Sequence, residues 1–125
     1  MNAAAIFSYI TALIYLLLGL GFLINPVGMA GGVGFKNLSS EALIDVRATY
    51  GGFLLFLGLL LGYWTYLGEL KPALLFILFS FTGFLIGRVI GLVAEWNGEW
   101  GAHLYWAKFE LLYLVLTWYF LKGLK

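Results

Sequence analysis

The stretch PALLFILFSFTGFLIGRVIGLV, from Pro72 to Val93, is apolar almost throughout and long enough to cross a lipid bilayer. Its one charged residue is Arg88, and the nearby Gly87 and Gly91 have no side chains that could shield the charge. A guanidinium at that depth costs at least about 2.5–3.5 kcal/mol on insertion scales. Proteins keep such a charge when it has a buried anionic partner or lines a wet cavity. Arg88 therefore marks the best candidate for a site.

The composition predicts that lipid surrounds the chain. Of the 125 residues, 63% are hydrophobic and 10% are charged, and a soluble domain of this size cannot bury that much apolar surface. The net charge of +1 argues against nucleic acid as a partner, because nucleic acid requires a clustered basic surface. The chain has no cysteine, which excludes disulfides, thiol redox chemistry, thiolate metal sites and cysteine nucleophiles.

Four apolar runs, each near the length that a bilayer requires, predict an all-α membrane protein built as a four-transmembrane-helix antiparallel bundle. The whole chain is expected to form a single integral membrane domain, with spans at about 3–24, 42–67, 72–95 and 102–122. The segment 26–38 is rich in glycine and is predicted to be a loop along the membrane surface. Ser39 or Ser40 is expected to cap the second helix.

The basic residues predict an orientation. Four spans place both termini on one side of the membrane, where Lys71, Lys122 and Lys125 also lie, whereas the opposite loops offer Lys36. Because cytoplasmic loops carry an excess of Lys and Arg, we expect both termini in the cytoplasm and the protein in the plasma membrane. No basic residue precedes the first apolar run, so a cleaved signal peptide is not expected.

The deep charges are predicted to meet in one half of the membrane. At 1.5 Å per residue, Arg88 lies about 10 Å below the end of its helix and Glu110 about 12 Å below the start of the next. Matched depth on neighbouring antiparallel helices predicts that the two side chains form a salt bridge. A purely structural ion pair between the helices is the alternative to a functional site.

The second helix brings further polar residues in from the same face of the membrane. Asp45 and Arg47 diverge by about 200° around that helix, so one of them is expected to reach Arg88 or Glu110, and we favour Asp45. On the fourth helix His103 shares a stripe with Glu110. The predicted ligand-binding residues are Asp45, Arg47, Tyr50, Arg88, Glu95, Trp106, Glu110 and Tyr113.

Small residues recur at intervals of four, at Gly58 and Gly62 and again at Gly83, Gly87 and Gly91. In membrane helices this spacing is typical of close packing between neighbours, and we expect that use here.

A metal site and a cofactor are not expected. Glu95, Glu99 and His103 are spaced by fours and could hold a hard or borderline cation, but the chain offers a single histidine and glycines interrupt the segment. A phosphate-binding loop after a strand, a Ser-His-Asp set and a histidine pair for haem are all missing from the sequence.

Two blocks carry a resemblance to a known family. The first is IDVRATYGG, from Ile44 to Gly52, and the second is GRVIG, from Gly87 to Gly91, followed by the late Glu110. Together they resemble a bacterial membrane family, the domain-of-unknown-function family 4345, which is similar in architecture to the DoxX-like four-helix proteins. The resemblance covers essentially the whole chain. It implies a four-span bundle in a bacterial inner membrane and no established activity.

Three functions are consistent with these features. The leading hypothesis is a binding protein whose bundle holds an amphipathic, lipid-like molecule, with arginine at its head and apolar walls around its tail. An accessory subunit of a larger membrane complex, or a homo-oligomer, would instead pack through the glycine faces. An intramembrane enzyme acting on a lipid-like substrate would use Glu110 or Asp45 as acid or base, with Arg88 stabilising charge.

Overall fold

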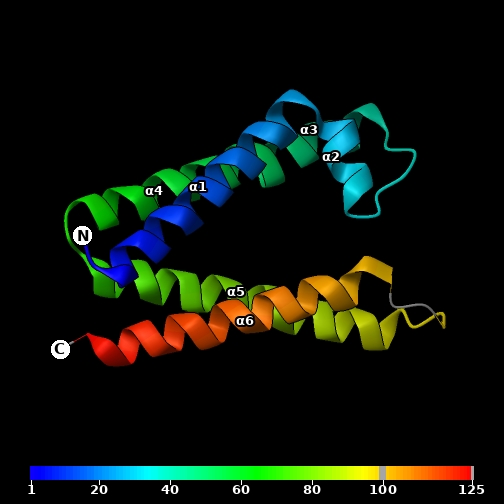
Figure 1. The fold of residues 1–125 in the computed structure, drawn as a ribbon. Coiled ribbons are helices and arrows are strands. Elements are labelled where there is room, and N and C mark those ends of the chain that lie inside the picture. Colours follow the sequence, from blue (N-terminus) through cyan, green and yellow to red (C-terminus); the bar gives the residue numbers. More distant parts are fainter. Residues whose placement is uncertain (99–100, 125) are drawn as a thin grey trace. The chain divides into compact units, whose positions relative to one another are not determined.

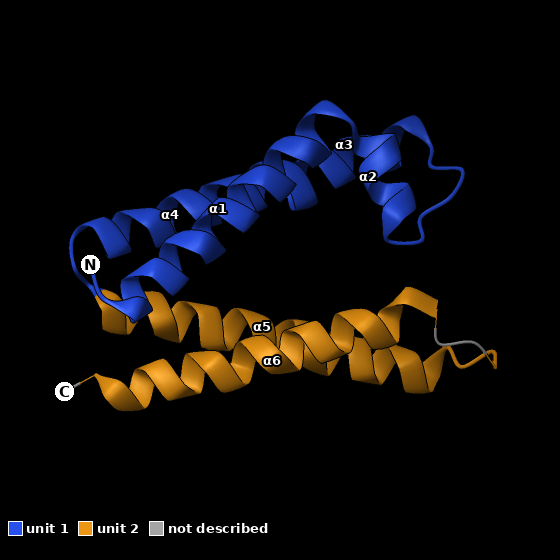
Figure 2. Ribbon diagram, in the orientation of Figure 1, with its two compact units in different colours: residues 1–69 blue, residues 70–125 orange. Residues whose placement is uncertain are grey.

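A computed structural model describes residues 1–98 and 101–124, so that Glu99, Trp100 and Lys125 lie outside the described residues. Within those ranges the chain forms helices joined by turns and loops and contains no strand, which confirms the predicted all-α class. The chain divides into two compact units, Met1–Glu69 and Leu70–Lys125 (Figure 2), and each is described by itself. The expectation of a single domain stays a prediction.

Unit 1 contains two long helical segments and one short helix (Figure 1). The elements are α1 Ala3–Ile24, α2 Pro26–Gly32, α3 Ser40–Val46, the π-helix η1 Arg47–Phe53 and α4 Leu54–Tyr66. The last three follow one another without a break, so residues 40–66 form one continuous helical segment where the second span is predicted. This segment packs along α1 through α4 and η1.

Asn25 explains why the first helix ends and the next begins. Its backbone N–H donates to the carbonyl of Gly21, which closes α1, and its side chain accepts from the N–H of Gly28, which caps α2. Pro26 then occupies the first helical turn, where its missing N–H costs nothing. The prediction of a loop from residue 26 was therefore wrong for Pro26–Gly32, because a capping Asn and an N-terminal Pro start a helix despite the glycines.

Ser39 begins the second long segment as predicted. Its side-chain oxygen accepts from the N–H of Ala42 at 3.1 Å, and Glu41 places an acidic group in the first turn, which favours the helix dipole.

The two long segments of unit 1 pack closely where glycine replaces a side chain. A Cβ on Gly19 would lie 2.6 Å from the backbone nitrogen of Leu55, and one on Gly58 would lie 3.0 Å from the carbonyl oxygen of Ala12. Gly62 is looser, because its Cβ would meet the Cβ of Ala12 at 3.8 Å. Close packing is thus confirmed at Gly58, and Gly19 is an additional site that its isolated position did not reveal.

Unit 2 is a pair of long helices, α5 Leu70–Ala94 and α6 Gly101–Gly123, that pack along one another (Figure 1). Aromatic rings form much of the contact. Phe81 of α5 stacks on Tyr113 of α6 with ring centroids 4.3 Å apart, and Phe109 lies 4.8 Å from Tyr113. Stacked and tilted ring pairs of this kind add about 0.5–1.5 kcal/mol to the burial of their area.

The glycines of α5 do not pack against α6. A Cβ on Gly83, Gly87 or Gly91 would meet no atom of unit 2 within 4 Å among the described residues. The aromatic side chain of Phe81, and not these glycines, meets α6, so close packing of the stripe against another surface stays a prediction.

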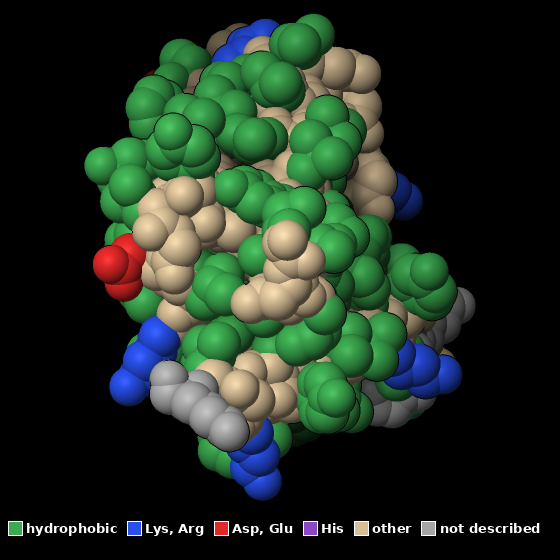
Figure 3. All heavy atoms as spheres, turned by 60° about the vertical axis from the view of Figure 1, so that its left-hand side comes forward, with side chains coloured by type: hydrophobic (Ala, Val, Ile, Leu, Met, Phe, Trp, Pro, Cys, Tyr) green, Lys and Arg blue, Asp and Glu red, His purple; other side chains and the backbone are tan. Residues whose placement is uncertain are grey.

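Among the described residues, three helical segments are long and apolar enough to cross a membrane: Ala3–Ile24, Ser40–Tyr66 and Leu70–Ala94. Helix α6 has 23 residues but carries Lys108, Glu110 and Lys122, and it is not one of the three. Large apolar side chains are exposed along all four long segments, and Figure 3 shows hydrophobic groups over most of the face in view. These properties support an integral membrane protein.

Candidate functional site

The predicted ion pair between Arg88 and Glu110 is present in unit 2. The guanidinium Nε donates to both carboxylate oxygens of Glu110 at 2.9 and 3.0 Å, and Nη2 donates to Oε1 at 2.6 Å. The side chain of Glu110 is 5% exposed and that of Arg88 is 22% exposed. A two-pronged, charge-assisted contact of this kind is among the strongest that side chains form, and it compensates a buried carboxylate that would otherwise be costly.

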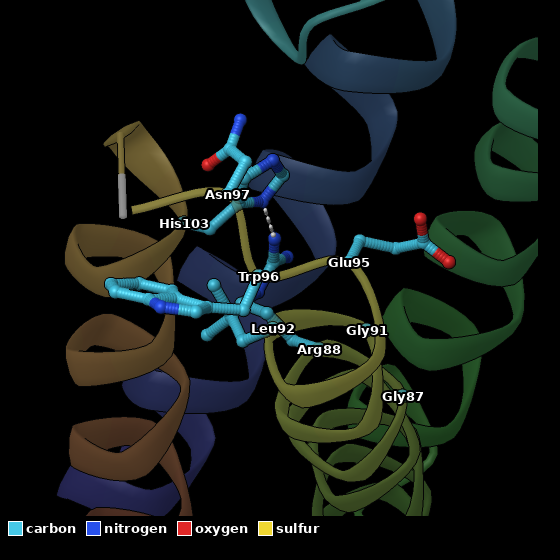
Figure 4. Close-up of a pocket in the computed structure, with 8 residues that line it drawn as sticks. All are labelled: Gly87, Arg88, Gly91, Leu92, Glu95, Trp96, Asn97 and His103. Carbon is cyan, nitrogen blue, oxygen red and sulfur yellow. Dashed lines mark hydrogen bonds between the residues drawn. The ribbon is translucent and has the colours of Figure 1, made fainter. Parts of the chain in front are cut away.

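His103 extends the pair. The Nη1 atom of Arg88 lies 2.9 Å from Nδ1 of His103, and Figure 4 marks this contact with a dashed line. A guanidinium can only donate hydrogen bonds, so Nδ1 of His103 is the acceptor. The imidazole is therefore neutral and carries its proton on Nε2.

The helices place these three side chains together for simple geometric reasons. Glu110 and His103 are seven residues apart on α6, which puts them on one stripe of the helix. Arg88 lies two turns before the end of α5, and α6 returns from that same end, so the depths match. The aromatic contact of Phe81 with Tyr113 lies further along the pair of helices and fixes their register.

A pocket of about 450 Å³ opens beside this cluster. Figure 4 shows its lining, which comes from α5, the turn that follows it and the start of α6: Gly87, Arg88, Gly91, Leu92, Glu95, Trp96, Asn97 and His103. Gly87 and Gly91 leave room because nothing stands where their Cβ atoms would be. The lining thus combines the charged Arg88 and Glu95 with the apolar side chains of Leu92 and Trp96.

Glu95 lines the pocket but does not bind Arg88. In Figure 4 its carboxylate points away from the guanidinium and from the ring of His103. The carboxylate is exposed, in contrast to that of Glu110.

The other two predicted site residues of unit 2 belong to aromatic contacts, Trp106 within α6 and Tyr113 between α6 and α5. Trp106 lies edge-on to Phe109 with ring centroids 6.2 Å apart, and Tyr113 is buried against Phe81. Neither lines the pocket. They support the helix that carries Glu110, one turn away on either side.

Three predicted site residues belong to unit 1. Asp45 is exposed on α3. The Nε atom of Arg47 donates to the backbone carbonyl of Leu23 at 3.2 Å. The ring of Tyr50 lies 5.2 Å from that of Phe22 and 6.0 Å from that of Phe35. The expectation that Asp45 meets Arg88 or Glu110 stays a prediction.

Several features of the site were not predicted from the sequence. The contact between His103 and Arg88 could have been found, because His103 shares a stripe with Glu110. Trp96 and Asn97 lie in the turn after α5, where no periodicity indicates which side chains face inward. The π-helix at Arg47–Phe53 also has no clear signal, although its Gly51-Gly52 pair lowers the preference for a regular α-helix.

The described residues add no ligands to the candidate metal site. Glu99 lies outside the described residues, and among those described no three His, Asp or Glu side chains lie close enough together to hold an ion. Glu110 is engaged with Arg88 instead.

Comparisons with known proteins add no relative. No protein-family model matches the chain, and neither the curated proteins nor the solved structures include a match.

Proposed function

We propose that this is a small integral membrane protein that binds the head of a lipid-like or amphipathic molecule in the pocket beside Arg88. The observation that carries the proposal is a cavity of about 450 Å³ with a buried ion pair at its edge, on a helix that is otherwise apolar. Small-molecule sites commonly have volumes of about 300–1,000 Å³ and combine many apolar groups with a few placed polar ones.

The lining suits a molecule with two chemical ends. Arg88, His103 and Asn97 offer polar groups, whereas Leu92 and Trp96 offer apolar surface (Figure 4). Beside the pocket, the apolar side chains of Ile90 and Val93 on α5 are exposed. An acyl or similar chain would lie on these side chains while its head occupies the pocket.

The proposal includes four membrane spans, with α6 as the fourth, in a bacterial inner membrane and with both termini in the cytoplasm. The ion pair supports this, because Arg88 neutralises Glu110 and so removes much of the cost of placing that carboxylate among lipids. The resemblance to family 4345 points the same way.

The test uses two glycines of α5 that differ in one respect. Gly91 lines the pocket and Gly83 does not, while a Cβ at either position meets no described atom within 4 Å. Gly91→Leu should therefore fill the pocket, and Gly83→Leu is the matched control with the same added volume. We expect native mass spectrometry of protein extracted from its membrane to show a lipid bound to the wild type and to Gly83→Leu, and lost from Gly91→Leu. Equal lipid retention by all three proteins would contradict the proposal.

The open glycine stripe also favours a second candidate, an accessory subunit. A partner helix could approach α5 closely along Gly83, Gly87 and Gly91, where small residues let membrane helices pack. In that case both leucine variants should release a stoichiometric protein partner. Loss of a bound protein from Gly83→Leu would favour this candidate. Loss of a lipid from Gly91→Leu alone would favour the binding protein instead.

A further inference from the structure

The positive charge of Arg88 is balanced by Glu110 within unit 2. Three of its five N–H groups point at partners, namely Nε–H and one N–H of Nη2 at Glu110 and one N–H of Nη1 at His103. Within the part of the chain that the structure describes, one N–H on Nη1 and one on Nη2 have no partner. The pocket can therefore receive two hydrogen bonds from a guanidinium whose positive charge is balanced by a carboxylate 2.6 Å away.

The remaining charges near the pocket do not favour an anion. Arg88 and Glu110 cancel, and His103 is neutral because its Nδ1 accepts from Arg88. Glu95 adds a negative charge to the lining. Lys108 is exposed and is not among the lining residues. Among the described residues of unit 2 that line the pocket, a phosphate or carboxylate would meet no uncompensated positive charge, and it would lose its hydration, which is costly for an ion.

We infer that the pocket takes an uncharged head group with oxygen acceptors, such as the hydroxyl and ester groups of a diacylglycerol, and not an anionic head group. This inference rests on the proposed function and names the chemical class of its ligand. The two free N–H groups of Arg88 donate to hydroxyl or carbonyl oxygens without a change in net charge. The Nε2–H of His103 is a further donor in the same lining.

Two probes with the same acyl chains and different heads test the inference: dioleoylglycerol, which is uncharged, and dioleoylphosphatidic acid, which is anionic. Each is titrated into the full-length protein in an uncharged detergent, and binding is read by native mass spectrometry. The affinity of the wild type and of Gly83→Leu for dioleoylglycerol should exceed that of Gly91→Leu by a factor of about ten or more, which is a difference of about 1.4 kcal/mol or more in binding free energy. Phosphatidic acid should bind all three proteins equally, through exposed cations outside the spans such as Lys36 and Lys71.

A charge variant sharpens the test. Glu110→Gln keeps the shape of the side chain and removes the charge that balances Arg88. Phosphatidic acid should then bind in the pocket of this variant. Adding Gly91→Leu to Glu110→Gln should abolish that binding. If Glu110→Gln does not fold, the inference is still tested by comparing how the two lipids bind to the wild type and to Gly91→Leu.

The outcomes separate the inference from the proposed function. Binding of phosphatidic acid that is lost in Gly91→Leu, on an otherwise wild-type chain, would overturn the uncharged-head inference and leave the proposed function standing. If neither lipid responds to Gly91→Leu, the pocket binds no such molecule and both fail.

Discussion

Two arginines in apolar helices find different partners. Arg88 contacts the carboxylate of Glu110, whereas Arg47 donates to the backbone carbonyl of Leu23 in the last turn of α1, where a cation also suits the negative end of the helix dipole. The first partnership was predictable, because depth along two antiparallel helices follows from residue counts. The second was not, because every residue has a backbone carbonyl and the sequence does not say which one is near.

The ion pair predicts unequal effects of removing its two members. Glu110→Ala leaves a guanidinium without its buried partner and should destabilise the protein by about 3–5 kcal/mol. Arg88→Met should cost clearly less, because the remaining carboxyl of Glu110 can take up a proton and become neutral. Thermal unfolding of the two variants in detergent measures the difference. The reverse order of stability would show that the surroundings tolerate the unpaired arginine better than the unpaired carboxyl.

At the scale of helices, glycines at one spacing serve two purposes. Gly58 lies against α1, whereas Gly83, Gly87 and Gly91 lie open on α5. The intervals in the sequence are the same, so the pattern could not distinguish them. What differs is the neighbouring surface: backbone of α1 approaches Gly58, while Phe81, Phe109 and Tyr113 hold α5 and α6 together elsewhere.

Alanine substitutions in unit 1 test the close contact of α1 with α4. Gly19→Ala places a methyl group 2.6 Å from the backbone of Leu55 and should destabilise by about 1–3 kcal/mol, because backbone cannot move aside as a flexible side chain can. Gly62→Ala adds the same atom at an ordinary contact distance of 3.8 Å and serves as the control. Melting temperatures in one detergent should fall for Gly19→Ala alone. An equal fall for both would mean that helix propensity or dynamics, and not the contact, sets the effect.

For the whole molecule, the sequence predicted the long helices well and their membrane role in part. The predicted spans 3–24 and 72–95 agree with α1 Ala3–Ile24 and α5 Leu70–Ala94 to within about two residues, because Asn, Pro and Gly interrupt apolar runs sharply. The fourth run also forms a helix, α6, but its charges and its many Tyr and Trp side chains lower its hydropathy. Apolar runs thus predict where helices lie more reliably than which of them cross a bilayer.

The absence of cysteine makes the orientation directly measurable. One introduced thiol is the only thiol of the protein, so labelling by a membrane-impermeant maleimide reports a single position. Lys36→Cys and Lys71→Cys replace exposed residues at the two predicted faces. In intact bacteria Lys36→Cys should be labelled and Lys71→Cys should react only after the membrane is opened. Labelling of both in intact cells would contradict the four-span topology.

The π-helix from Arg47 to Phe53 inserts an extra residue into the second long segment, relative to a regular α-helix. A π-turn bonds each N–H to the carbonyl five residues earlier, one residue more than in an α-turn, and such turns recur at functional sites. The surplus can migrate along the helix while both ends stay anchored, and each residue it passes rotates by about 100°. We therefore expect Arg47 and Tyr50 to rotate about the helix axis without unfolding of the segment. A spin label at the exposed Thr49 would show two orientations if the π-turn migrates, and a single orientation if the π-turn stays in place.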